Sequence, residues 1–412
     1  MTPPIFFGRI YFLKVTYILS IFKRVKYSEG VKIHMTTFNL IATCAAGVEA
    51  LVGNELRDLG YEVEVENGRV RFKGTAKDIA KTNLWLRVAD RIKIVIGEFE
   101  AKTFDDLFEQ TKALPWDQYI PMDGKFPIAG KSIKSTLHSV PAVQSIVNKA
   151  VAESIKETYH RRGMLPETGA EYPIEIALRN DKALLTMDTT GDSLFKRGYR
   201  TEKGGAPLKE NLAAALIALT TWRKDRPFVD PTTGSGTIAI EAALIGQNIA
   251  PGFNRSFLCE DWDWMEEAMW EEVREEADNL MDYDAELDIL GFDIDENMIK
   301  IAERNALAAG VAHNIEFKQL AVADFKTDKE FGIMVSNPPY GDRLGEEESV
   351  HKLYREMGEA FRPLETWSKY IITSDLEFEK YYGERATKKR KLYNGTIRTD
   401  YFQYWGKRPK RK

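Results

Sequence analysis

Cysteine is scarce in this chain of 412 residues, which contains only Cys44 and Cys259, far apart and in no CxxC spacing. This scarcity argues against a disulfide framework and against a zinc site, and it favours a reducing cytoplasm as the compartment. Long hydrophobic runs are also lacking, because the apolar segment Ile10–Phe22 has 13 residues, includes Lys14 and is too short to span a bilayer. We therefore expect neither a metal nor a membrane partner.

The first 34 residues differ in character from the rest of the chain. Their basic residues Lys23, Arg24 and Lys26 follow the apolar run, whereas a signal peptide carries such residues before it, and no small-residue cleavage site follows. We interpret residues 1–34 as a leader that is either disordered or absent because translation starts at Met35. A peripheral membrane tether and an added structural segment are the alternatives.

Charge is unevenly distributed along the sequence. The net charge of −5 at first argues against a nucleic-acid partner, but residues 260–286 alone carry 13 acids and one arginine. Residues 385–412 carry 11 Lys or Arg and one Asp. A basic face can therefore exist on an acidic protein, although a solvated, disordered end would also explain the basic tail.

Residues 35–190 mix helix and strand patterns and predict an α+β region. Alternating strands flank turn signals at Asn67-Gly68 and Asn180-Asp181, and an amphipathic helix is expected from about Ala142 to Tyr159. The region has no Gly-rich phosphate loop. Basic residues cluster in sequence around its last helix, namely Lys131, Lys134, His138, Lys149, Lys156, Arg161 and Arg162. They form either an ordinary charged helix face or a patch that contacts RNA phosphates.

Residues 191–412 alternate strand and helix patterns, which predicts a doubly wound, mostly parallel sheet. Ligands of such sheets bind beyond the carboxyl ends of the strands. The first such end, DPTTGSGT (Asp230–Thr237), has glycines that allow close approach to a ligand, but it matches neither a P-loop nor GxGxxG. We expect a ligand at this edge.

Two further strand ends carry carboxylates. In GFDID, Asp293 is placed to accept hydrogen bonds from both ribose hydroxyls, whereas Asp295 better suits a helix cap. In AVADF, Asp324 suits the exocyclic amine of adenine, although a turn residue is an equal interpretation. Together with the Gly-rich loop, these ends describe a site for an adenosine that carries a charged amino-acid tail.

The fourth strand end, SNPPY (Ser336–Tyr340), predicts the chemistry. An amide oxygen from Asn337 and a carbonyl held by Pro339 can accept both N–H bonds of an exocyclic amine and orient its nitrogen toward a sulfonium methyl. Tyr340 can stack on an unpaired base. No strong general base is needed, because the departing thioether is neutral. A plain turn is the alternative.

These four motifs resemble class I S-adenosylmethionine-dependent methyltransferases that act on exocyclic amines. The wider string RGYR…KENLAAAL…DPTTGSGT…IAPGFNR…SNPPYGDRLG…KLYNG is similar to the THUMP-domain RNA methyltransferases, and among them to the 23S ribosomal RNA guanine-N2 methyltransferases. The resemblance implies a THUMP-containing RNA-binding region at 35–190 and a Rossmann-like methyltransferase domain at 191–412.

The resemblance also implies roles for individual residues. The cofactor, S-adenosylmethionine, would contact Asp230, Thr232, Gly234, Ser235, Gly236, Thr237, Asp293, Ile294, Asp324, Phe325 and Asn337. The guanine would be held by Asn337, Pro338, Pro339 and Tyr340. RNA would contact Lys131, Lys134, Lys149, Lys156, Arg161 and Arg162.

Two departures from the family pattern are visible. Thr233 stands where the family often has Cys, and no second methyltransferase domain follows, so one activity is expected. N6-adenine methylation of RNA or DNA stays open, because an Asn-Pro-Pro-Tyr motif can orient the exocyclic amine of adenine as well as that of guanine. A non-catalytic RNA-binding assembly factor is a further alternative, against which the intact Asp230, Asp293 and Asn337 argue.

Overall fold

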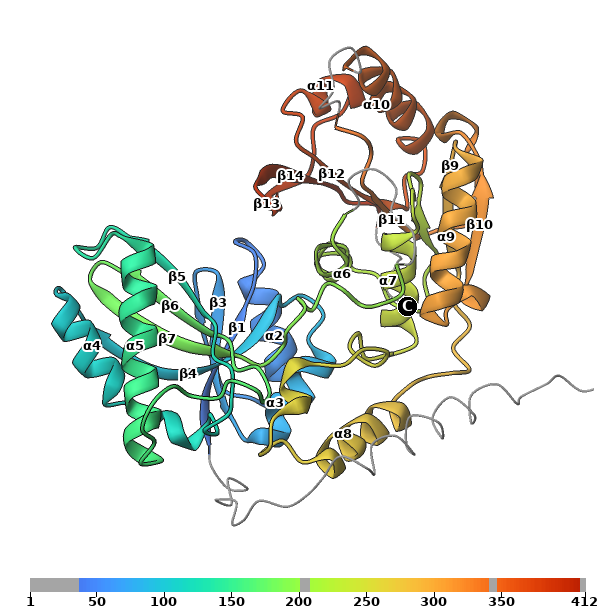
Figure 1. The fold of residues 1–412 in the computed structure, drawn as a ribbon. Helices are drawn as coiled ribbons and strands as arrows, with labels where there is room; N and C mark the ends of the chain where they lie inside the picture. Colours follow the sequence, from blue (N-terminus) through green and yellow to red (C-terminus); the bar gives the residue numbers. More distant parts are fainter. Residues whose placement is uncertain (1–36, 201–207, 341–346, 408–412) are drawn as a thin grey trace, which may run out of the picture. The chain divides into compact units, whose positions relative to one another are not determined.

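The computed structural model describes residues 37–200, 208–340 and 347–407, all within one compact unit, His34–Lys412. The leader interpreted at residues 1–34 and the GDRLG part of the fourth motif lie outside the described residues. The described chain forms two seven-stranded sheets (Figure 1). None of its helices combines the length and the apolar character that a membrane span requires.

The first sheet is mostly antiparallel. Its strands are β1 (Phe38–Thr43), β2 (Val63–Glu66), β3 (Arg69–Gly74), β4 (Arg91–Glu100), β5 (Ile128–Ile133), β6 (Ile174–Arg179) and β7 (Lys182–Asp188), in the order β2-β3-β1-β4-β7-β6-β5. Only β5 and β6 pair in parallel. Asn180 and Asp181 both have positive φ, as a two-residue hairpin turn requires, and they join β6 to β7 as predicted.

Helices cover one face of this sheet. They are α2 (Glu49–Asp58), α3 (Ala76–Trp85), α4 (Phe104–Lys112) and α5 (Val140–Thr158). Gly130 on β5 makes room for α5, because a Cβ there would come within 2.9 Å of the Gln144 side chain. Thr75 and Thr103 start α3 and α4 with capping boxes. Gly130 therefore lies on the helix-covered face of the sheet. Since side chains alternate along a strand, the neighbouring residues of β5 point to the opposite, helix-free face.

The second sheet is parallel in its first five strands. Its members are β8 (Phe228–Asp230), β9 (Ile289–Asp293), β10 (Ile315–Gln319), β11 (Ile333–Ser336), β12 (Ser368–Thr373), β13 (Lys388–Asn394) and β14 (Ile397–Tyr404), in the order β10-β9-β8-β11-β12-β14-β13. The last two strands form an antiparallel hairpin against β12. The order reverses between β8 and β11, which is where ligands of doubly wound sheets bind.

Helices lie on both faces of the second sheet. They are α6 (Glu210–Ala218), α7 (Thr237–Gly246), α9 (Glu296–Ala309), α10 (Glu347–Phe361) and α11 (Phe378–Tyr382). The helix α8 (Glu267–Asn279) packs instead against α3 of the first region. Neighbouring residues of β14 show the two layers, because Tyr401 donates to the Leu216 carbonyl of α6 at 3.0 Å while Phe402 packs on Phe378 of α11. The predicted fold class, a Rossmann-like domain preceded by an α+β region, is confirmed.

Short 3-10 helices connect several of these elements. They are η2 (Trp116–Gln118), η3 (Leu258–Asp261), η4 (Ala312–Asn314) and η5 (Val322–Asp324).

The acidic, tryptophan-rich segment 260–286 contains the helix α8. Its tryptophans contact the first half of the chain. Trp262 donates to the Glu171 carbonyl at 2.8 Å and stacks on Tyr172, and Trp264 donates to the Tyr119 carbonyl at 3.1 Å. The segment therefore fastens the second half of the chain to the first.

Candidate active site

Three neighbouring strands bring the predicted motifs together at one edge of the second sheet. Asp230 ends β8, Asp293 ends β9, and Asn337 follows β11. These strands are adjacent in the order β9-β8-β11, and all three run in parallel. The motifs, more than 100 residues apart at their extremes, thus share one carboxyl edge.

The Gly-rich loop is held to β9 by its backbone. The Thr233 amide donates to the Phe292 carbonyl at 3.0 Å, and the Gly234 amide donates to Asp293 Oδ2 at 2.9 Å. Gly236 has a φ of +85°, and a Cβ there would lie 3.0 Å from the Ala302 Cβ of α9. Glycine is required at position 236 both by the backbone conformation and by this close packing.

Asp230 is the most unusual group at this edge. Its side chain is buried, and neither carboxylate oxygen has a hydrogen bond of good geometry among the described residues, although Thr233 and the Thr232 and Ala239 amides lie close enough to lower its pKa. Burial raises the pKa of Asp230 to about 7. A buried carboxylate without a donor is costly unless a ligand supplies one, so the position suits a cationic or N–H-bearing group of a bound molecule.

The hydroxyl residues of the loop connect the first motif to the fourth. Thr232 Oγ1 lies 2.8 Å from Ser336 Oγ, the last residue of β11. Ser235 and Thr237 are buried, and their hydroxyl oxygens lie 3.4 Å apart. Ser336 was not among the predicted site residues, although its position directly before Asn337 could have indicated it.

The second and third strand ends place their carboxylates differently. Asp293 is half-buried and also accepts from the Asp295 amide at 3.0 Å, while Asp295 itself caps α9, as predicted. Ile294 is 72% exposed. Asp324, at the end of η5, is exposed, and the neighbouring Phe325 is buried against Phe292 with a ring distance of 5.1 Å. All of these predicted cofactor contacts follow β9 or β10 at the carboxyl edge.

The fourth motif is held in shape by two tyrosine hydroxyls. Tyr340 donates to Asn337 Oδ1 at 2.7 Å, and Tyr354 of α10 donates to the Pro339 carbonyl at 3.2 Å. Tyr354 is fully buried, and its oxygen lies 2.9 Å from Thr373 Oγ1 at the end of β12. Sequence reasoning missed Tyr354, because an aromatic residue on the apolar face of a helix carries no motif.

Arg200 is a second residue that sequence reasoning did not assign. Its guanidinium donates to Thr237 Oγ1 at 2.8 Å and lies 3.4 Å from a Glu210 carboxylate oxygen. Burial raises the pKa of Glu210, although Arg200 opposes this effect. The RGYR string contains the residue, but only the structure shows that Arg200 reaches the start of α7.

The predicted RNA-contacting residues do not form one patch. Lys131 lies on the face of β5 opposite α5, whereas Lys149 and Lys156 lie on α5 itself. Arg161 and Arg162 are exposed just after that helix, and Lys134 is exposed just after β5. Because α5 covers the other face of the sheet, the structure separates Lys131 from the helix-borne cations.

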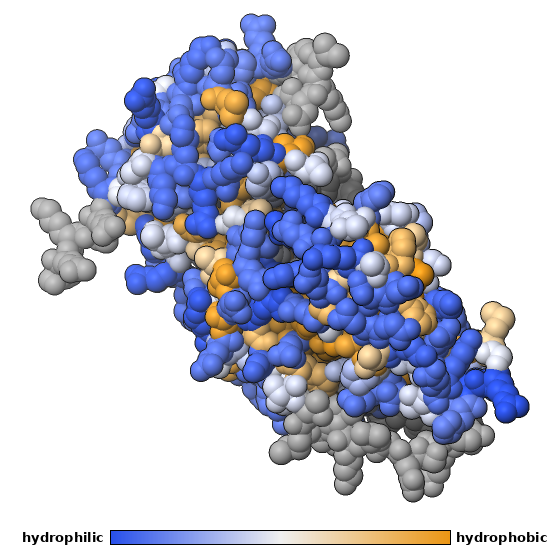
Figure 2. All heavy atoms as spheres, turned by 90° about the vertical axis from the view of Figure 1, so that its left-hand side faces the viewer, coloured by the Kyte–Doolittle hydropathy of each residue, from blue (hydrophilic) through white to orange (hydrophobic). Residues whose placement is uncertain are grey.

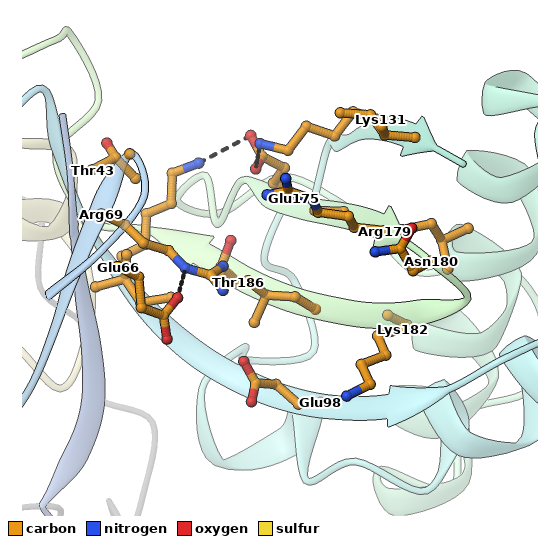
Figure 3. A pocket seen from close by; sticks show the side chains of 18 of the residues that line it. Thr43, Glu66, Arg69, Glu98, Lys131, Glu175, Arg179, Asn180, Lys182 and Thr186 are labelled. Carbon is orange, nitrogen blue, oxygen red and sulfur yellow. Dashed lines mark hydrogen bonds and ion pairs between the residues drawn. The ribbon is translucent and has the colours of Figure 1, made fainter. Parts of the chain in front are cut away.

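Lys131 lines a groove of about 940 Å³ on the helix-free face of the first sheet (Figure 3). Glu175 at its centre is paired with both Lys93 and Lys131, at 3.0 and 2.8 Å. Burial tends to raise the pKa of Glu175, but the two lysines hold it below its usual value. Glu66 pairs in the same way with Arg69 and Arg71. Four of the six cations that line the groove are thus paired with its glutamates, whereas no ion pair is seen for Arg179 and Lys182 among the described residues.

The surface seen in Figure 2 is mainly hydrophilic, with hydrophobic side chains in groups between hydrophilic ones. Among the described residues, no group of three or more His, Cys, Asp or Glu side chains is close enough to hold a metal.

Known protein families match three successive parts of the chain. The RlmL ferredoxin-like domain matches residues 39–93, the THUMP domain matches residues 101–188, and the RMKL-like methyltransferase domain matches residues 197–403. The chain is 57% identical to YpsC of Bacillus subtilis, named as a candidate RNA methyltransferase, over 92% of this chain and 99% of that protein.

Two further relatives extend the comparison. The ribosomal RNA large subunit methyltransferase K/L of Syntrophotalea carbinolica is 33% identical over 86% of this chain, which spans 52% of that larger protein. The solved structure of SMU.472 in complex with SAH is 55% identical, covers 91% of this chain and 99% of its own, and superposes with a TM-score of 0.87. The chain therefore belongs to the family of RMKL-like methyltransferases with an N-terminal THUMP domain.

Proposed function

We propose that this protein transfers a methyl group from S-adenosylmethionine to the exocyclic N2 amine of a guanine in structured RNA, namely 23S ribosomal RNA. The observation that carries the proposal is the junction of the Gly-rich loop with SNPPY through Thr232 and Ser336. This junction supports a nucleoside-type site beside a pair of amine acceptors, Asn337 Oδ1 and the Pro339 carbonyl. The names of the K/L relatives support ribosomal RNA, and the SAH complex of SMU.472 supports the cofactor.

The residues at the carboxyl edge fit the cofactor by their chemistry. S-adenosylmethionine supplies an electrophilic methyl on a sulfonium and leaves as S-adenosylhomocysteine. Asp230 has two unpartnered oxygens for the cationic amino-acid end of the cofactor. Asp293 offers acceptors for ribose hydroxyls, Asp324 an acceptor for the adenine amine, and exposed Ile294 an apolar surface for the base.

The SNPPY residues would prepare the guanine amine. Asn337 Oδ1 has two lone pairs, of which Tyr340 uses one, so the second can accept an N–H of the amine. The Pro339 carbonyl can accept the other N–H, and Pro338 stiffens the turn between them. With both N–H bonds engaged, the nitrogen lone pair is oriented for in-line attack. The positive charge of the product is lost as a proton after transfer.

The remaining assignments rest on the first half of the chain. We propose that RNA docks on the region 35–190, with contacts from Lys131, Lys134, Lys149, Lys156, Arg161 and Arg162, and that the catalytic region is 191–412. The THUMP match supports an RNA substrate. The buried, unpaired thiols of Cys44 and Cys259 agree with a cytoplasmic location.

One experiment tests the proposal directly. The purified protein is incubated with labelled S-adenosylmethionine and total RNA from a strain that lacks the gene, and the modified nucleotide is mapped by mass spectrometry. The expected product is N2-methylguanine in 23S RNA. A methylated adenine at N6 would replace the proposed base with its alternative, and no transfer to any RNA by a folded protein that binds the cofactor would overturn the proposal.

A further inference from the structure

The basic stretch near the end of the chain is a β-hairpin and not a disordered tail over its described length. Residues 385–399 contain six Lys or Arg and no Asp or Glu, and most of them lie on β13 or the first residues of β14. The alternative of a solvated, disordered end is therefore wrong for β13 and β14. β13 is the outermost strand of the second sheet, so these cations line a sheet edge (Figure 1).

The strand register aligns this hairpin with the active site. Ser336 pairs with Ile371, Ile371 pairs with Phe402, and Phe402 pairs with Lys389. Lys389 is therefore level with the end of β11, and the residues that follow it extend in the same direction as SNPPY. β13 lies three strand spacings from β11, which is roughly 14 Å. The hairpin tip thus projects beyond the same carboxyl edge as Asn337, a few nucleotides away.

The two faces of the hairpin have different partners. Leu392 and Thr399 are buried on the inner face, where Arg390 donates to the Gly47 carbonyl at 2.7 Å. Alternation then places Lys391 and Tyr393 on the outer face, and Arg398 stands directly opposite Tyr393. Toward the tip, this outer face carries one aromatic ring between two cations.

Lys391, Tyr393 and Arg398 are available to a ligand. The Lys391 and Arg398 side chains are exposed, and Tyr393 is half-buried, with Lys391 Nζ 5.3 Å from its ring centroid. Among the described residues, Lys391 has no carboxylate within ion-pair distance, and Arg398 has only Asp400, at 3.6 Å. Asp400 also stands directly opposite Lys391 on the neighbouring strand, so one carboxylate faces two cations and this face of the tip keeps a net positive charge.

Cations that flank an aromatic ring are the recognition pattern of single-stranded nucleic acid. A base stacks on the ring and the phosphates on either side meet the cations. Lysines on an edge strand also discourage pairing with other sheets, a role that Lys388 can fulfil equally. Edge protection does not require the aromatic ring or its alignment with SNPPY.

We propose that the outer face of the β13–β14 tip, formed by Lys391, Tyr393 and Arg398, holds the unpaired RNA nucleotides that adjoin the target base. Tyr393 stacks on a neighbouring base, while Lys391 and Arg398 contact phosphates. This inference rests on the proposed RNA substrate and adds a docking surface to it. The surface keeps the strand extended so that the target base can enter beside Asn337.

The test measures the binding of protein-free 23S RNA from the gene-deletion strain by filter binding over a salt series, together with steady-state methyl transfer. Tyr393→Ala is expected to weaken binding about tenfold, the scale of one lost base stack, and Tyr393→Phe to restore it. Lys391→Gln should reduce the salt slope by about 0.7. Both losses should raise KM and leave kcat nearly unchanged, because docking contributes equally to the bound substrate and the transition state.

Lys388→Gln is the matched control, since it removes the same charge from the same exposed strand at the end away from the tip. It should leave binding and KM close to wild type. Equal losses for Lys388→Gln and Lys391→Gln would overturn the docking surface and leave only a non-specific basic edge. Wild-type binding by Tyr393→Ala, with thermal unfolding unchanged, would overturn it as well. If the wild-type protein itself neither binds nor methylates this RNA, the proposed function has failed, and the proposed docking surface fails with it.

Discussion

The two sheets of this protein have the same number of strands but differ in whether their charged side chains have partners within the protein. On the open face of the first sheet, glutamates pair with neighbouring cations, as Glu175 does with Lys93 and Lys131. At the carboxyl edge of the second sheet, Asp230 keeps two buried oxygens without partners. The outer face of the β13–β14 tip likewise keeps Lys391 without a carboxylate within ion-pair distance among the described residues, and its one carboxylate, Asp400, faces two cations.

This difference separates groups that stabilise the fold from groups that are prepared for a ligand. A paired charge has already exchanged water for a protein partner, so a ligand must displace that partner before it gains anything. An unpartnered buried carboxylate costs folding free energy that a bound ligand can recover. The strongest functional effects should therefore come from the second sheet, and the weakest from the paired groove of the first.

The largest expected effect is at Asn337. Asn337→Ala removes the amide acceptor for the substrate amine and should reduce methyl transfer by about 2–4 kcal/mol of transition-state stabilisation, the scale of one oriented polar contact in an active site. Cofactor affinity, measured by calorimetry, should change little, because Asp230 and Asp293 remain. Single-turnover rates equal to wild type would show that Asn337 does not orient the amine.

Asp230 should show the next largest effect, with opposite signs for stability and function. Its folded pKa of about 7 exceeds the ordinary value of 3.8 for an aspartate, so the folded state binds the proton more tightly than the unfolded state. The carboxylate therefore lowers stability progressively as pH rises from about 4 to about 7, and the full penalty is present above pH 7. Asp230→Asn should raise the free energy of unfolding by about 2–3 kcal/mol at pH 8.

Urea unfolding at pH 4 and pH 8 checks this prediction. The gain from Asp230→Asn should be small at pH 4, and calorimetry at pH 8 should show weaker binding of S-adenosylmethionine. A stability gain that is independent of pH would contradict the assignment of the penalty to the buried charge. Unchanged cofactor affinity would remove Asp230 from the cofactor site.

Tyr354 should have a smaller effect, because it acts through the Pro339 carbonyl and does not touch the substrate. Tyr354→Phe removes the hydrogen bond to the Pro339 carbonyl, worth about 1 kcal/mol, together with the contact to Thr373 Oγ1, and should lower kcat about fivefold with little change in KM. Tyr382→Phe is the matched control, since Tyr382 packs in the same buried cluster and its hydroxyl has no partner among the described residues. Equal kinetics for the two variants would refute a positioning role for Tyr354.

The sequence predicted the parallel sheet and its four polar strand ends because each end carries a local signature. Glycines, a terminal Asp or an Asn-Pro-Pro-Tyr string follow an apolar strand in every case. Tyr354 and Ser336 have no such signature, since their roles come from contacts with Pro339 and Thr232 across the fold. The ion pair of Lys131 with Glu175 could not be predicted for the same reason, because Glu175 lies on another strand, 44 positions away in the sequence.

Substitution of Lys131 should give the smallest effect. It tests whether an ion-paired lysine of the first sheet contributes little to RNA binding. Because Glu175 already balances this lysine, Lys131→Gln should alter the salt slope of RNA binding by clearly less than the value of about 0.7 expected for one full phosphate contact. Its stability cost should stay below about 1 kcal/mol, as for other exposed ion pairs. Glu175→Gln supplies the complementary measurement, because it releases Lys93 and Lys131 together. If that variant binds 23S RNA more tightly and with a steeper salt slope, the groove faces the RNA and its glutamates weaken the binding. If binding is unchanged, the RNA contacts of the first half lie on the α5 side.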